Sequence, residues 1–99
     1  MIDHWPFSDP RNVLTFTVRQ IVRDRHPILR VTHDSDDGAW QFLEWTTPNE
    51  EDAMILCLEE VAKLDPSIFE LADLPLGWRA TRRNASDTWH RELNPNDPS

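Results

Sequence analysis

The chain has 99 residues, a formal net charge of −8 and one cysteine, Cys57. This length fits one domain, and the acidic balance disfavours nucleic-acid binding because it repels phosphates. A single cysteine cannot form an internal disulfide, and neither a secretion signal nor an apolar run near the roughly 18 residues of a membrane helix is visible. We therefore expect a cytoplasmic protein without membrane association.

The negative charge is concentrated in the middle of the chain. Residues 34–74 carry twelve of the 18 carboxylates and only one basic residue, Lys63. A surface with this charge attracts basic partners. The alternative is that these carboxylates only keep the surface solvated.

The N-terminal third predicts a lead-in and one short element. Residues 1–12 are irregular, with Trp5 and Phe7 packing onto the domain. The apolar spacing that follows predicts a helix over 16–25, although the run Val13–Val18 also alternates as a strand does.

A β-hairpin is predicted next. The strands Ile28–His33 and Ala39–Glu44 flank the turn Asp34-Ser35-Asp36-Asp37-Gly38. Gly38 accepts a positive φ without strain, and aspartate side chains bond to nearby backbone N–H groups in turns.

The segment Thr47-Pro48-Asn49-Glu50 reads as a capping box and predicts a helix over 48–64. Apolar residues at helical spacing would form one buried stripe that includes Cys57, namely Met54, Cys57, Leu58, Val61 and Leu64. Asp65-Pro66 predicts a second, short helix. Strands over 78–83 and 88–92 follow, and then a disordered tail over 94–99.

One weak internal repeat links the two strand pairs. Arg30-x-Thr32 with Trp40 recurs as Arg79-x-Thr81 with Trp89, displaced by 49 residues. Two hairpins of similar geometry would produce such a match without duplication.

These elements predict a single α+β domain over 1–93. The two hairpins form a four-stranded, mainly antiparallel sheet, and the helix 48–64 packs on one face. The other face is either solvated or covered by a partner, and a homodimer is one such arrangement. The expected core consists of Ile21, Val22, Leu29, Val31, Phe42, Met54, Cys57, Leu58, Val61, Phe69, Trp78 and Trp89.

No pattern assigns catalysis, a metal or a cofactor. The four histidines lie outside known catalytic motifs, and two glycines are too few for a phosphate-cradling loop. We therefore expect a protein that is not an enzyme. The hairpin tip resembles a calcium loop, but Gly38 and Trp45 stand where that loop needs an acid at position 5 and a glutamate at position 12.

The segment from Ile28 to Ala80 resembles a small uncharacterised family of bacterial proteins, a domain of unknown function. The shared pattern is a hairpin with the residues DxDDGxWQF, an acidic helix, and then Asp65-Pro66 and Leu74-Pro75 with Gly77-Trp78. That family is more loosely similar to immunity-type proteins of bacterial toxin systems. The family resemblance itself carries no activity over to this chain, and the looser similarity makes an immunity-like role one form of the interaction hypothesis below.

The leading hypothesis is a protein–protein interaction module that binds a basic partner protein through its acidic surface. The candidate binding residues surround the hairpin tip: His33, Asp34, Asp36, Asp37 and Trp40. The alternative is a small-ligand or divalent-metal-binding domain centred on the same tip, and a small enzyme ranks below both.

Overall fold

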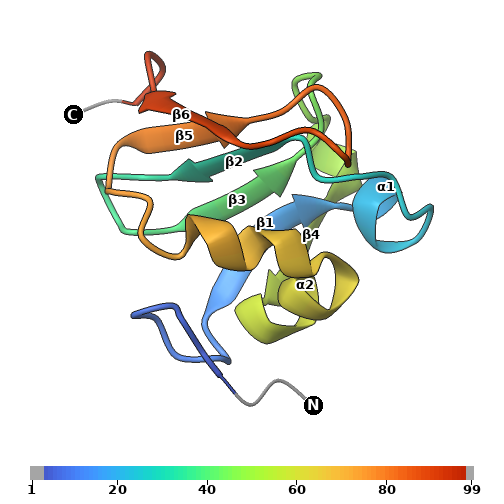
Figure 1. Ribbon diagram of the computed structural model, residues 1–99. Helices are drawn as coiled ribbons and strands as arrows, with labels where there is room; N and C mark the ends of the chain where they lie inside the picture. Colours follow the sequence, from blue (N-terminus) through green and yellow to red (C-terminus); the bar gives the residue numbers. More distant parts are fainter. Residues whose placement is uncertain (1–3, 98–99) are drawn as a thin grey trace.

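The computed structural model describes residues 4–97 and shows an α+β fold built on one six-stranded mixed sheet (Figure 1). The strands are β1 (Leu14–Val18), β2 (Arg30–His33), β3 (Trp40–Leu43), β4 (Ala53–Cys57), β5 (Trp78–Thr81) and β6 (His90–Leu93). Their spatial order is β4-β1-β3-β2-β5-β6. The helices are α1 (Arg19–Val22), η1 (Glu50–Asp52), α2 (Leu58–Leu64) and η2 (Pro66–Leu71).

The sheet is larger than the predicted four-stranded one because two extra strands join it. The two predicted hairpins are present as β2–β3 and β5–β6, and β2 pairs with β5 in antiparallel fashion. On the free side of β3, β1 pairs in parallel and β4 then pairs with β1. The α+β class is therefore confirmed, and the predicted strand number is wrong.

The helix predicted over 16–25 is a strand followed by one helical turn. In β1, Leu14 and Phe16 are exposed while Thr15 and Thr17 are buried, which is the alternation of a strand. Both buried hydroxyls donate hydrogen bonds to carbonyls of neighbouring strands, at 2.7 and 2.8 Å. Pairing with β4 along all five residues of β1 outweighs the weak helical spacing.

The helix predicted over 48–64 is also wrong in its first half, where η1 and β4 precede α2. The predicted capping box does not form, because Asn49 is the cap residue of η1 and makes no side-chain cap bond. The apolar stripe is divided between the two elements. Met54 lies opposite Thr17 in the sheet, whereas Leu58 and Val61 are buried on α2.

One face of the sheet carries the hydrophobic core. Figure 1 shows α2 and η2 on the same side of the sheet. Phe7 from the lead-in also packs there, edge-on to Trp40 with ring centroids 5.4 Å apart. Of the predicted core residues, five are fully buried, namely Ile21, Val31, Phe42, Leu58 and Val61. The other seven, including Cys57, are partly buried.

A buried ion pair joins η2 to the end of β5. Asp65 caps η2 by accepting a hydrogen bond from Ser67 N at 3.0 Å, as expected for the short helix. Asp65 also pairs with Arg82 at 2.7 Å, and the Arg82 side chain is only 3 % exposed. Arg82 Nε donates to the Ile28 carbonyl, and its guanidinium lies 4.1 Å from the ring centre of Trp89. This group of contacts makes Arg82 a structural residue.

Part of the predicted disordered tail is bound to the sheet. Asn94 N donates to the Gly77 carbonyl at 2.8 Å, and Ser35 donates to the carboxylate of Asp97 from both its main chain and its hydroxyl. Residues 98–99 of that predicted tail lie outside the described residues. Within residues 4–97, no helix has the length and apolar character needed to cross a membrane.

Candidate functional site

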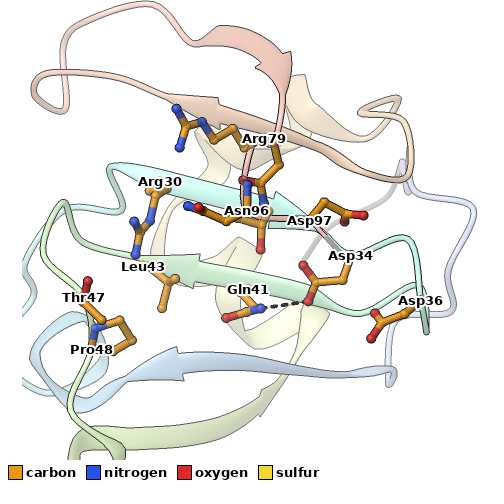
Figure 2. Close-up of a pocket in the computed structure, with 12 residues that line it drawn as sticks. Arg30, Asp34, Asp36, Gln41, Leu43, Thr47, Pro48, Arg79, Asn96 and Asp97 are labelled. Carbon is orange, nitrogen blue, oxygen red and sulfur yellow. Dashed lines mark hydrogen bonds between the residues drawn. The ribbon is translucent and has the colours of Figure 1, made fainter. Parts of the chain in front are cut away.

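The second face of the sheet, which we call the uncovered face, carries a shallow hollow of about 360 Å³. The strands β2, β3 and β5 supply its floor, and the hairpin turn, the loop before η1 and the C-terminal segment supply its rim (Figure 2). The lining residues are Arg30, Thr32, Asp34, Asp36, Gln41, Leu43, Thr47, Pro48, Arg79, Asn94, Asn96 and Asp97.

Strand register places the floor residues. Thr32 lies directly opposite Gln41 on one side and Arg79 on the other. Arg30 lies opposite Leu43, two residues along β2 from Thr32. Because side chains alternate between the faces of a strand, all five point to the uncovered face. The hollow thus has a polar floor.

The two copies of the Arg-x-Thr repeat noted in the sequence lie opposite each other in the floor of the hollow, where β2 pairs with β5. Arg30 pairs with Thr81, and Thr32 pairs with Arg79, so the two Arg-x-Thr segments lie antiparallel to each other. Each arginine therefore has a threonine opposite it and the other arginine on the diagonal. The repeat is the sequence signal that could have identified Arg30, Thr32 and Arg79, which the candidate binding set omitted.

Acidic residues gather at the hairpin end of the hollow. The turn closes with Gly38 N bonded to the Asp34 carbonyl at 2.9 Å, and Gly38 takes the positive φ of 74° that favours glycine. Gln41 Nε2 donates to the Asp34 carboxylate at 2.8 Å, as Figure 2 shows. Asp36 and Asp97 line the same end. One end of the hollow is therefore acidic, and the other contains two arginines.

The predicted site residues do not form one cluster. Asp34 and Asp36 line the hollow, and exposed Asp37 accepts a hydrogen bond from Ala39 N within the turn. His33 and Trp40 lie on the covered face instead, where their rings stack with centroids 3.8 Å apart. His33 Nδ1 is 2.7 Å from the carbonyl oxygen of Leu74.

Trp40 is 1 % exposed, and its Nε1 donates to Asp9 at 3.3 Å. This burial places Trp40 in the core, although the sequence groups it with the candidate binding residues. His33 is held by its ring stack and its carbonyl contact. Both residues lie on the covered face and do not line the hollow.

Groups suited to metal binding are not assembled in the described part of the chain. Among residues 4–97, no cluster of three or more histidine, cysteine or acidic side chains has the geometry to hold a metal ion. Asp34 is instead bonded to an amide side chain.

An apolar ridge adjoins the hollow. It consists of Leu14, Phe16 and Ile55, which are 65, 47 and 59 % exposed. Phe16 lies directly opposite Ile55 and beside Gln41 of the hollow floor. The ridge and the hollow therefore form one continuous surface on the uncovered face.

Compared with known proteins, the chain matches no family model, no curated protein and no solved structure. The family resemblance expected from the sequence stays a prediction.

Proposed function

We propose that the chain is a non-enzymatic, immunity-like binding protein of the bacterial cytoplasm that docks a basic partner protein on the uncovered face of its sheet. The observation that carries this proposal is the apolar ridge of Leu14, Phe16 and Ile55 beside a hollow lined by charged side chains. Neighbouring large apolar residues on an exposed surface are typical of interaction sites. An apolar centre with a polar border is the usual composition of a protein interface.

The charges left over after internal pairing favour a basic partner. Seven of the ten basic residues form ion pairs with carboxylates of the chain itself. Exposed Asp36, Glu50 and Glu51 have no such partner among the described residues. Asp36 borders the hollow, so a basic partner meets negative charge beside the ridge.

The arginines of the second hairpin do not change this balance. Arg82 and Arg91 pair with Asp65 and Asp73 at the two ends of η2, both at 2.7 Å. Arg83 pairs within its own loop with Asp87 at 3.2 Å. These arginines pair with Asp65, Asp73 and Asp87, and none of these three carboxylates lines the hollow.

The test is affinity capture of the tagged chain from a bacterial lysate, with matched leucine variants. Leu14 and Leu93 are 65 and 67 % exposed, but Leu93 lies on edge strand β6, opposite Trp78 of the covered face. We expect wild type and Leu93→Glu to retain the same basic protein, and Leu14→Glu to lose it because a charge interrupts the apolar ridge. Equal retention by both variants would overturn the proposal, and so would capture of only a second copy of the chain.

Salt and charge reversal test the electrostatic part of the same interaction. The double variant Asp36→Lys with Asp37→Lys should slow association about tenfold while changing dissociation less, because charges near an interface act mainly on the association rate. High salt should reduce the wild-type rate toward that of the variant. An association rate that neither salt nor the double variant changes would rule out a basic partner.

A further inference from the structure

Two polar groups on the floor of the hollow are buried without a partner. Thr32 is only 8 % exposed, and its Oγ1 forms no hydrogen bond with any residue in the range 4–97. Arg30 Nε is buried beside it and likewise lacks an acceptor in that range. Both residues line the hollow, and Figure 2 shows Arg30 above Leu43. A buried polar group left unpaired costs about 1–3 kcal/mol, so these atoms point to a ligand that supplies the missing bonds.

The positive charge of Arg30, like its Nε–H group, lacks a partner at this end of the hollow. Arg79 forms an ion pair at 3.2 Å with the exposed side chain of Glu92, whereas the Arg30 guanidinium has no carboxylate partner among the described residues. Burial, and then the positive charge of Arg79, lower the pKa of Arg30. Arginine nevertheless stays protonated at neutral pH. The fold therefore keeps a partly desolvated cation next to a like charge, and an oxyanion would relieve both penalties.

The opposite end of the hollow limits which anion fits. Asp34, Asp36 and Asp97 line that end and would repel a phosphate dianion more strongly than a carboxylate. A strand rises about 3.3 Å per residue, so the Cα atoms of Arg30 and of Asp34, the residue that follows β2, are about 13 Å apart. A ligand that satisfies both ends carries a carboxylate at one end and a positive charge about 13 Å away. An extended peptide of about four residues has that length.

We propose that Arg30, Thr32 and Arg79 form a carboxylate-binding subsite, and that an extended peptide segment occupies the hollow with its carboxylate on Arg30 and a basic side chain near Asp34 and Asp36. The inference rests on the proposed function, because it assigns the segment to the basic partner protein. Arg30 donates to the carboxylate through its planar fork, and Thr32 Oγ1 donates the bond that it lacks in the free protein. The carboxylate is either a chain end or an acidic side chain.

The test uses short peptides and nuclear magnetic resonance of the whole chain. The first probe is acetyl-Lys-Gly-Gly-Gly with a free carboxylate, and its matched control is the same peptide with a C-terminal amide. A third peptide, acetyl-Lys-Gly-Gly-Glu-amide, offers a side-chain carboxylate instead of a chain end. We expect saturable shifts of the Arg30 Nε–H and Thr32 N–H signals with a carboxylate peptide, and at least about tenfold weaker binding of the amide control, which corresponds to one lost charge-assisted contact.

Comparison of the two carboxylate peptides identifies the source of the carboxylate. Tighter binding of the first peptide assigns the subsite to a chain end, and tighter binding of the third assigns it to an acidic side chain. Equal binding of all three peptides, or no saturable shift with any of them, would overturn the subsite.

Substitutions separate the subsite from a general charge effect. Arg30→Gln should reduce binding of the carboxylate peptides to the level of the amide control. Arg23→Gln is the matched control, because Arg23 is exposed, has no ion-pair partner among residues 4–97 and lies outside the hollow. Equal weakening by both substitutions would contradict the assignment.

The variant Thr32→Val tests whether weaker peptide binding comes from the lost hydroxyl or from a damaged fold. It keeps the side-chain shape and removes only the unbonded hydroxyl, so we expect an unchanged or higher melting temperature together with severalfold weaker peptide binding. A large drop in melting temperature would show that the hydroxyl is satisfied within the fold, which contradicts the proposal. The two proposals can fail separately. If no peptide binds but a basic protein is still captured in a way that depends on Leu14, the subsite is wrong and the proposed function stands.

Discussion

At the residue scale, two arginines of the same chain have opposite roles. Arg82 is enclosed by Asp65, Ser67 and the ring of Trp89, and its donors are used inside the fold. Arg30 is partly buried and has no anionic partner among the described residues. Structural arginines find their partners inside the protein, and unpaired ones that line a hollow are candidates for ligand binding.

We predict that Arg82→Met lowers the free energy of unfolding by about 3 kcal/mol, because it leaves Asp65 without its buried partner. Arg83→Met is the control. The Arg83 side chain is 82 % exposed and pairs with Asp87 on the surface, so its loss should cost less than about 1 kcal/mol. Urea denaturation of the two variants measures the difference, and equal losses would refute the structural role of Arg82.

A single surface carboxylate, Asp87, is expected to make the stability of the fold depend on pH. The backbone N–H of Arg83 and then its side chain lower the pKa of Asp87 in the folded protein. A carboxylate with a lowered folded pKa stabilises the protein above its unfolded pKa, which is about 3.9 for aspartate. That contribution is lost as the pH falls through the lower folded value.

We therefore predict that Asp87→Asn lowers the melting temperature at pH 6, and that the difference from wild type shrinks as the pH is lowered from about 5 to 3. Thermal unfolding followed at a series of pH values is the measurement. A difference that stays constant down to pH 3 would show that the Asp87 charge does not contribute.

At the element scale, prediction from the sequence succeeds where local chemistry decides the structure. The turn with Gly38 and the Asp65 cap of η2 form as predicted, because each depends on a few adjacent residues. The prediction fails for β1 and β4, which stabilise each other across about forty residues of chain. An apolar spacing of three and four residues cannot reveal such a long-range pair, since a strand followed by a helix produces it equally well.

Hydrogen exchange should reflect the sheet order. Strands β1 and β3 are paired on both sides inside the sheet, whereas β6 is an edge strand whose four residues are all exposed. We predict that amides of the four inner strands, β1, β2, β3 and β5, exchange more slowly than those of β6. Faster exchange in β1 than in β6 would contradict the observed order.

At the scale of the whole molecule, the sheet has one covered and one uncovered face. The sequence predicts this asymmetry, and it places Asp34 and Asp36 correctly at the hairpin tip. It does not predict that His33 and Trp40 point away from them, because that outcome depends on which face α2 covers. The arginine end of the hollow was missed because Arg30 and Arg79 are 49 residues apart in the chain and meet only through the pairing of β2 with β5.

If a partner protein docks on the uncovered face, the footprint of the captured partner on this chain will show it most directly. We predict that hydrogen exchange on complex formation slows at β1 and β4, which carry Leu14, Phe16 and Ile55, and at the hairpin turn, while α2 and η2 stay unchanged. Protection confined to α2 and η2, with β1 and β4 unaffected, would contradict the account.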